Sequence, residues 1–127
     1  METLTTKGIK ISVDVRYQAS QSRPVHNQHV FAYQITIENL GEHTVQLLRR
    51  HWYIYDACGM REVEGEGVIG KQPILRPGDI HQYTSLCPLF GGIGKMRGTY
   101  LMESQINQSR FRVLVPEFQM VAPAKLN

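Results

Sequence analysis

An unbroken alternation of apolar and polar residues from Ile9 to Tyr17 limits what this chain can fold into. Successive side chains of a β-strand point to opposite faces, so a period of two residues predicts a strand with one buried face. The same period returns in segments 31–37, 96–102 and 111–115. The sequence lacks the period of about 3.6 residues that marks an amphipathic helix. We therefore predict an all-β protein.

The segment Val45–Asp56 is a further expected strand, and its phase changes part-way along. Val45 and Leu47 alternate in one phase, whereas Trp52 and Ile54 alternate in the other. One extra residue near Leu47, a β-bulge, would bring both pairs to the same face of the strand. The sequence therefore predicts a bulge between these two pairs.

Residues rich in Gly, Pro, Asn and Asp separate the expected strands. Residues 56–59 predict a hairpin turn, with 60–64 as the returning strand. Residues 80–85 predict a short strand, and 88–94, with three glycines, predict a loop. Pro116 interrupts the last strand, which indicates an edge strand or a bulge there.

Small sheets bury one face each, so two of them must pack together. A length of 127 residues suits one domain. We predict a single domain, an immunoglobulin-like (fibronectin type III-like) β-sandwich of about seven to eight strands. Tyr100 is a candidate for the tyrosine corner of such domains, and residues 1–7 and 122–127 are expected to fray.

Gly65, Gly67 and Gly70 form G-x-G-x-x-G, the spacing that cradles a pyrophosphate in dinucleotide-binding folds. That use needs a helix directly after the glycines, whose N-terminus meets the phosphates. Pro73 and Pro77 follow instead and would break such a helix. The dinucleotide-binding interpretation is therefore excluded.

Two interpretations of the glycine segment stay open. A nest of backbone N–H groups could bind an anion, such as pyrophosphate or a nucleotide, without a helix. Gly65, Gly67 and Gly70 would then form the site, with Lys71 and Arg76 as nearby cations. Alternatively, the glycines provide positive φ or close backbone approach in an irregular connection between strands.

Candidates for catalysis and metal binding are sparse. His26 and His29 are the only closely spaced histidines, and no third ligand follows at a zinc spacing. We expect both to be solvated loop residues. Cys58 and Cys87 form no C-x-x-C pair, and the sequence shows no export signal, which favours reduced thiols. We therefore expect no catalytic residue, no bound metal and no cofactor.

Charge and hydropathy constrain the partners. The net charge is only +3, and basic residues are scattered apart from the runs 49–51 and 95–97. Nucleic-acid binding would need a concentrated basic stripe, so we expect none. The apolar runs span only a few residues, which predicts no membrane insertion. Without a signal sequence, a cytoplasmic location is expected.

The aromatic strand around Trp52 offers a second candidate site. In one interpretation Trp52 and Ile54 fill the core, while Tyr53 and Tyr55 are half exposed. In the other, Arg49, Tyr53 and Tyr55 form a sheet face where a protein partner docks, because Tyr and Arg favour interfaces. The open edges of a sandwich offer another docking mode, by strand addition.

Several blocks of this sequence together resemble one known family. They are Val63-Glu64-Gly65-Glu66-Gly67-Val68-Ile69-Gly70-Lys71-Gln72-Pro73, Leu75-Arg76-Pro77-Gly78, Tyr83-Thr84-Ser85, Cys87-Pro88-Leu89 and Met96-Arg97-Gly98-Thr99-Tyr100. An upstream R-x-W-x-I pattern, Arg50 to Ile54, fits as well. In order and spacing they are similar to the ApaG proteins. Leu86 and the loop at 90–94 depart from the family's pattern.

The resemblance implies a small bacterial cytoplasmic protein with a fibronectin type III-like fold. Similar domains at the end of some eukaryotic F-box proteins look like partner-binding modules. Family members are also linked to a diadenosine-tetraphosphate hydrolase encoded nearby, to cobalt resistance and to magnesium efflux. Residues and resemblance together favour a non-enzymatic module that binds an unidentified protein. The alternative is a binder of a phosphate-containing ligand, such as a diadenosine polyphosphate, through residues 65–71.

Overall fold

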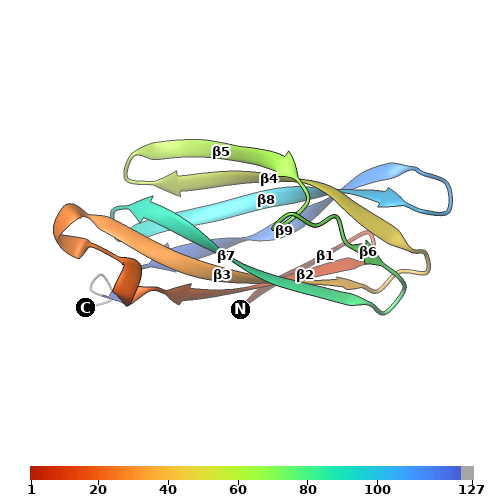
Figure 1. The fold of residues 1–127 in the computed structure, drawn as a ribbon, viewed down its shortest axis with the longest axis horizontal. Helices are drawn as coiled ribbons and strands as arrows, with labels where there is room; N and C mark the ends of the chain where they lie inside the picture. The colour runs from red at the N-terminus through yellow and green to blue at the C-terminus, as the bar shows by residue number, and fades with distance from the viewer. Residues whose placement is uncertain (124–127) are drawn as a thin grey trace.

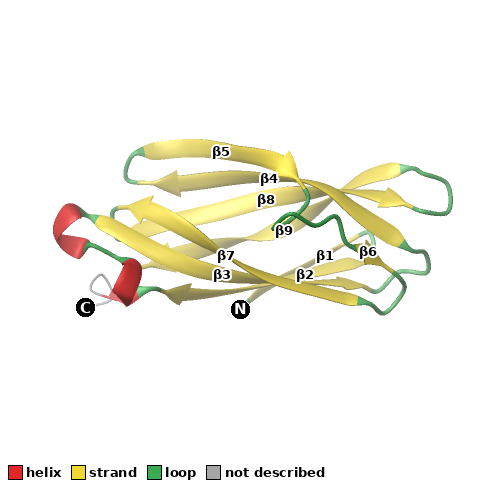
Figure 2. Ribbon diagram, in the orientation of Figure 1, coloured by secondary structure: helices red, strands yellow, loops and turns green. Residues whose placement is uncertain are grey.

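The computed structural model describes residues 1–123, which form nine strands and two short 3₁₀ turns (Figures 1 and 2). The strands are β1 (Glu2–Thr6), β2 (Ile9–Tyr17), β3 (Gln28–Asn39), β4 (Val45–Asp56), β5 (Gly59–Glu66), β6 (Ile74–Leu75), β7 (Ile80–Phe90), β8 (Ile93–Ser104) and β9 (Arg110–Val121). The 3₁₀ turns, η1 (Ala19–Gln21) and η2 (Pro24–His26), lie in the connection between β2 and β3.

Two antiparallel sheets pack face to face. The first sheet has the order β1-β2-β3-β7, and the second has the order β5-β4-β8-β9, with β6 also pairing with β4. The chain changes sheet between β3 and β4, between β6 and β7, and between β7 and β8 (Figure 1). These crossovers confirm the predicted immunoglobulin-like sandwich. The strand count is nine, because β1 and the two-residue β6 were not expected.

The N-terminal residues are not frayed. Glu2–Thr6 pairs with β2 along its full length, from Glu2 opposite Val13 to Thr6 opposite Ile9. Its threonine-rich sequence lacks an apolar alternation because most of the strand is exposed. At the other end, the amide of Ala122 donates to the Gly92 carbonyl over 2.7 Å. Ala122 is therefore anchored, and residues 124–127 lie outside the described residues.

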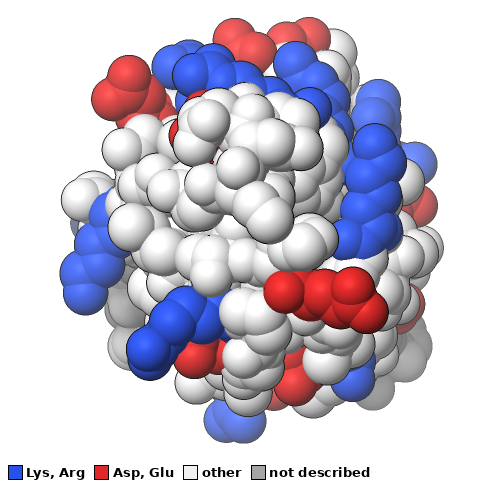
Figure 3. Space-filling model, turned by 90° about the vertical axis from the view of Figure 1, so that its right-hand side faces the viewer, with Lys and Arg blue, Asp and Glu red and all other residues white. Residues whose placement is uncertain are grey.

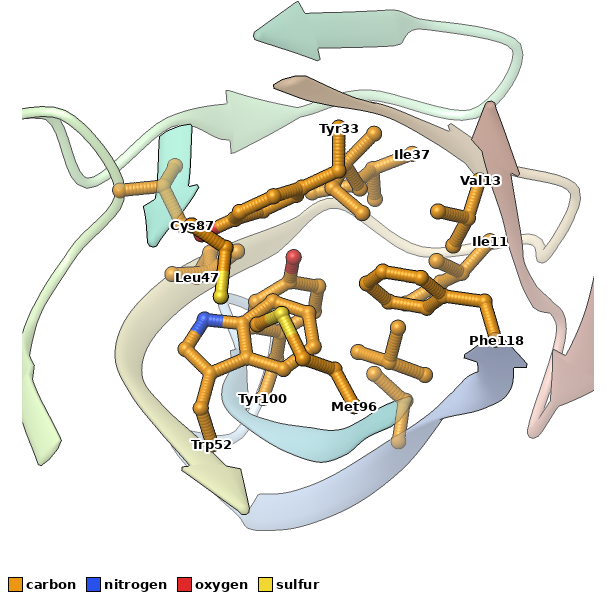
Figure 4. Close-up of a cluster of buried hydrophobic side chains, with 14 of the residues drawn as sticks. Ile11, Val13, Tyr33, Ile37, Leu47, Trp52, Cys87, Met96, Tyr100 and Phe118 are labelled. Atoms are coloured by element: carbon orange, nitrogen blue, oxygen red, sulfur yellow. The ribbon is translucent and has the colours of Figure 1, made fainter. Parts of the chain in front are cut away.

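The core lies between the sheets and is built from the alternating residues (Figure 4). Ile9, Ile11 and Val13 on β2 are buried, as the period of two predicts. Trp52 meets the rings of Tyr33 and Phe118 edge-on, with centroids 5.6 and 6.1 Å apart. Full burial of one large apolar side chain stabilises a fold by about 1.5–3 kcal/mol.

The predicted bulge in β4 is confirmed. Pairing with β8 shifts register between Leu47 and Arg49, so Leu48 is the extra residue. The extra residue brings Leu47 and Trp52 to the same buried face. A second shift between Met96 and Gly98 of β8 lies opposite Pro116, in the edge strand β9. The interpretation of Pro116 as an edge or bulge residue is therefore also confirmed.

Two expectations were wrong. Residues 88–94 do not form a long loop, because β7 continues to Phe90 and β8 begins at Ile93. Tyr100 is not a tyrosine corner either. Its hydroxyl bonds with the hydroxyl of Tyr83 on the opposite sheet, within the sandwich. Burial raises the pKa of Tyr100 and keeps its phenol neutral.

Candidate functional site

The glycine segment forms a small hairpin between β5 and β6. Ile69 and Gly70 have φ values of 47° and 71°. Val68 and Lys71 exchange two backbone hydrogen bonds around them, of 2.8 and 3.1 Å. Two successive residues with positive φ are typical of a type I′ turn. An isoleucine rarely adopts such a φ, so the tip of this hairpin is strained.

Most polar groups of the segment are used within the fold. The Gly67 amide donates to the Leu48 carbonyl at the bulge, over 2.9 Å. Nη1 of Arg50 donates to the carbonyls of Glu66 and Gly67, both over 3.0 Å. Within residues 1–123, the amides of Ile69 and Gly70 form no backbone hydrogen bond at this turn. The segment therefore offers few backbone donors to an anion.

Steric contacts explain two of the three glycines. A Cβ atom at Gly65 would lie 2.8 Å from Nη1 of Arg50, whose guanidinium packs against this residue. A Cβ atom at Gly67 would overlap the Lys71 carbonyl oxygen. Gly70 has open space but needs its positive φ. These contacts support the interpretation of the glycines as a close-packed connection.

The two cations predicted beside the loop differ in their contacts. Arg76 lies in the turn before β7, where its amide and Nε contact Asp79 Oδ2 at 2.9 and 3.4 Å. Lys71 forms no ion pair within residues 1–123. Burial, and then the charge of Lys71, lower the pKa of His81 on β7. Anion binding by this loop stays a prediction, with Lys71 as an exposed cation that forms no ion pair within residues 1–123.

The second predicted site lies on the outer face of the second sheet. Arg49, Tyr53 and Tyr55 share one phase of β4, while Trp52 and Ile54 point into the core, as predicted. Tyr53 and Tyr55 are partly exposed, and Arg49 is exposed. His51 has the same phase, and its ring stacks on Tyr53 with centroids 4.4 Å apart.

Two cations from β8 complete this surface. The guanidinium of Arg97 lies 4.3 Å from the ring centroid of Tyr53, and its Nη2 donates to the Tyr55 hydroxyl over 3.1 Å. Nζ of Lys95 lies 5.1 Å from the Tyr55 ring centroid. Exposed cation–π contacts contribute about 0.5–1 kcal/mol each. We call His51, Tyr53, Tyr55, Lys95 and Arg97 the tyrosine face.

An acidic row on the edge strand β5 borders the tyrosine face. The two ring nitrogens of His51 face Glu62 and Glu64, at 3.1 and 2.8 Å. Arg49 lies 3.9 Å from Glu66 in the same row. These contacts orient His51, and through its ring also Tyr53.

The outer face of this sheet carries both basic and acidic side chains, and two of its arginines have no ion-pair partner within residues 1–123. Its remaining carboxylates are also paired, Glu117 with Lys95 at 3.6 Å and Glu103 with Arg110 at 3.2 Å. Arg97 forms no ion pair within residues 1–123, and neither does Arg112 of β9. Arg112 lines a depression of about 60 Å³ together with Arg49, His51 and Thr99.

Sequence reasoning missed three members of the tyrosine face, namely His51, Lys95 and Arg97. The basic run 95–97 was visible, and residues two apart on a strand share a face. What the sequence does not show is that Arg97 pairs with Tyr53 and Lys95 with Tyr55 across two strands far apart in the chain. That register was the missing information.

The histidine and cysteine candidates have structural surroundings. His29 is buried at the start of β3, with Nδ1 hydrogen-bonded to the Tyr17 hydroxyl at 2.9 Å, so it is not a solvated loop residue. Cys58 and Cys87 are both free thiols. Cys87 is only 2% exposed, and burial raises its pKa to about 11. A thiol with that pKa is a weak nucleophile at neutral pH.

A cavity lies away from both predicted sites, at one end of the sandwich. It has a volume of about 460 Å³, and its lining includes the turn residues Lys7, His43 and Ile106 and the strand residue Phe111. Figure 3 shows this end, where charged side chains surround a mostly uncharged centre. Among residues 1–123, no group of three His, Cys, Asp or Glu side chains could hold a metal ion. The same residues contain no helix that could cross a membrane.

Comparison with known proteins identifies the family. The sequence profile of the ApaG domain matches residues 19–104, more than half of the chain. Protein ApaG of Paramagnetospirillum magneticum is 48% identical over 97% of this chain and 95% of that protein. The chain belongs to the ApaG family. Protein ApaG of Bdellovibrio bacteriovorus is 43% identical, and the match covers 100% of both proteins.

Two solved structures share the fold. The crystal structure of the putative ApaA protein from Bordetella pertussis matches with a TM-score of 0.87 and 45% identity, covering 91% of this chain and 94% of that one. A protein from Archaeoglobus fulgidus matches with a TM-score of 0.52 at 8% identity, over 87% of this chain and 95% of that one. The second likeness concerns the fold alone. The first supports the ApaG assignment.

Proposed function

We propose that this ApaG family member is a non-enzymatic protein-binding module and that the tyrosine face is its docking surface. One observation carries the proposal: Arg97 is held between the rings of Tyr53 and Tyr55 by contacts of 4.3 and 5.9 Å on an open sheet face. Tyr and Arg dominate the binding energy of many interfaces. Side chains already fixed in place lose less conformational entropy on binding.

The charge of the surface indicates the kind of partner. Arg97 and Arg112 have no carboxylate partner within residues 1–123, whereas Glu66, Glu117 and Glu103 each lie beside an arginine or a lysine. An acidic surface on the partner would complement the two arginines and accelerate association. We therefore expect binding to weaken as ionic strength rises.

The buried Cys87, with its raised pKa, supports the non-enzymatic part of the proposal. The resemblance to ApaG proteins supports a cytoplasmic location and a link to cobalt resistance and magnesium efflux. In this proposal the module would affect ion transport through its protein partner. A strain lacking the protein should then regain normal cobalt tolerance with the native sequence and not with a tyrosine-face variant.

A pull-down with purified chain tests the docking surface. The variant Tyr53→Ala/Tyr55→Ala removes the aromatic part of the face, and Gln34→Ala/Thr84→Ala changes two exposed residues on the other sheet as a matched control. We expect recovered partners to be lost with the first variant and retained with the second. Equal recovery with all three proteins would remove the tyrosine face from the proposal.

The alternative function is binding of pyrophosphate or a nucleotide by Gly65, Gly67, Gly70, Lys71 and Arg76. Its support is the exposed Lys71 beside the unengaged amides of Ile69 and Gly70. Titration with pyrophosphate, ATP and diadenosine tetraphosphate, followed by amide NMR, decides it. Saturable shifts at residues 65–71 that disappear in Lys71→Gln would establish this function. An unchanged spectrum at millimolar ligand would end it.

A further inference from the structure

Each long side of the sandwich has one edge strand from each sheet, and the two sides differ in how these edge strands are covered. On one side the edge strands β1 and β9 come together, and the Leu114 amide donates to Oγ1 of Thr6 over 3.3 Å. On the other side the edges are β5 and β7 (Figure 1). An unpaired edge presents free N–H and C=O groups, and natural proteins usually protect it with charged residues. The two open edges can therefore be compared for protection.

β5 carries charged side chains of its own, and β7 does not. β5 carries Arg61, Glu62, Glu64 and Glu66 within its eight residues. β7 has no Lys, Arg, Asp or Glu along its eleven residues, IHQYTSLCPLF. An uncharged edge of that length is the kind to which another strand can add.

Contacts at the end of β7 show which residues face outward from the sheet. The Pro88 carbonyl accepts from Nη2 of Arg61, and the Phe90 amide donates to Asp56 Oδ2 over 3.0 Å. Both groups therefore point away from β3. In an antiparallel strand, every second residue turns its N–H and C=O to the same side. Ile80, Gln82, Thr84 and Leu86 have the phase of Pro88, so their backbone groups face the open edge.

We propose that a second copy of this chain pairs with β7 along this edge, antiparallel, with the two Tyr83 residues opposite each other on a two-fold axis. This register joins the four outward-facing residues that precede Pro88 in each copy. Ile80 pairs with Leu86 of the second copy, and Gln82 pairs with Thr84 of the second copy. Pro88 ends the ladder, since it has no N–H and its carbonyl is taken by Arg61.

The side chains in this register are self-complementary. Ile80 and Leu86 are 59% and 49% exposed on the outer face of the sheet, and pairing them across the axis buries apolar surface on both copies. Gln82 and Thr84, both exposed, form polar pairs between them. No like charges oppose each other in the ladder. The dimer would join two four-stranded sheets into one continuous sheet.

The expected dimer is weak, because a ladder of four residues buries less surface than a standard stable interface. Its population should rise with protein concentration from the micromolar to the millimolar range. Sedimentation velocity and light scattering measure this directly. The Tyr53→Ala/Tyr55→Ala variant should dimerise like the native chain, because the tyrosine face lies on the other sheet. The β7 dimer and the docking role of the tyrosine face can therefore be refuted independently of each other.

Thr84→Pro is the most specific way to disrupt the β7–β7 pairing. The lost N–H points away from β3, so the variant should keep its fold, whereas both copies lose a hydrogen bond at the interface. We expect association to weaken by about tenfold or more. Thr84→Ala is the matched control, because it keeps the N–H, and should dimerise like the native chain. Circular dichroism verifies that each variant is folded.

Two further variants keep the proposal falsifiable if Thr84→Pro does not fold. Gln82→Lys/Thr84→Lys places like charges opposite each other and should give a monomer. Gln82→Cys/Thr84→Cys, with Cys58→Ser, should form disulfides between copies on oxidation, since paired Cα atoms would be about 5.5 Å apart. A native chain that stays monomeric at millimolar concentration overturns the proposal. So does a dimer that neither Thr84→Pro nor Gln82→Lys/Thr84→Lys weakens.

Discussion

The second sheet uses arginine differently on its inner and outer sides. On its inner side Arg50 and Arg61 donate to backbone carbonyls of Glu66, Gly67 and Pro88. On the outer side, Arg97 of β8 contacts the tyrosine side chains of β4 and remains exposed. The inner arginines fix the glycine segment and the end of β7 in place. The outer one is available to a partner.

This difference separates a family signature from the proposed binding surface. The glycine segment is the most recognisable sequence in the chain, yet Arg50 and the Leu48 bulge occupy most of its polar groups. The tyrosine face has no recognisable motif, since its members come from β4 and β8. Changes on the inner side should therefore affect stability, and changes on the outer side should affect binding.

The largest loss of stability is expected from Gly67→Ala. The new Cβ would overlap the Lys71 carbonyl, and φ at this residue is +64°. We expect the free energy of unfolding to fall by about 3 kcal/mol in urea denaturation. Gly70→Ala is the control, since it has positive φ and open space, and should cost about 1 kcal/mol. Equal losses would contradict the close packing of the loop.

Asp56 anchors the other end of β5, and its effect should depend on pH. Its side chain is 1% exposed and accepts from Arg61 at 3.0 Å. Burial by itself would raise the pKa of Asp56, but hydrogen bonds from the amides of Phe90 and Cys58, and from Arg61, lower it. Asp56→Asn should cost about 2 kcal/mol at neutral pH.

The sign of the pH effect follows from the lowered pKa. A carboxylate with a lowered folded pKa stabilises the fold above its unfolded pKa, about 4, and loses this effect as pH falls toward the folded value. The difference between native chain and Asp56→Asn should therefore be constant from pH 7 to about 5 and shrink below about 4. A difference that grows in acid would contradict this assignment.

A gain of stability is expected from Ile69→Asn. Isoleucine at φ 47° is strained, and Asn-Gly is a preferred pair for a type I′ turn. We expect the unfolding free energy to rise by about 1 kcal/mol, measured by thermal denaturation. Ile74→Asn, at another exposed isoleucine with ordinary φ, is the control and should give no gain.

The smallest effect concerns the outer side. A double-mutant cycle with Tyr53→Ala and Arg97→Ala should give a coupling energy of about 0.5–1 kcal/mol, because an exposed cation–π pair is weak. Each variant should unfold at nearly the native denaturant concentration. A coupling above about 2 kcal/mol would mean that Arg97 is structural, like Arg50, and would remove the contrast between the two sides.

Much of this fold could be predicted from local patterns. The alternation in β2, the phase change at Leu48 and the proline in β9 each depend on a few neighbouring residues. β1 was missed because its exposed threonines show no alternation, and β6 because two residues carry no period. The positions of Arg49, Tyr53 and Tyr55 followed from one strand. Their contacts with Arg97 and Lys95 could not, since register between distant strands depends on the whole sandwich.

The bulge at Leu48 has a consequence for how this sequence can change over time. Its carbonyl accepts from the Gly67 amide and from Nε2 of Gln72, each over 2.9 Å. A deletion at Leu48 would remove this acceptor and turn the outward-facing residues beyond it inward. A length change in 67–73 would leave the acceptor unused. Among relatives, insertions and deletions at Leu48 should therefore occur together with length changes in 67–73.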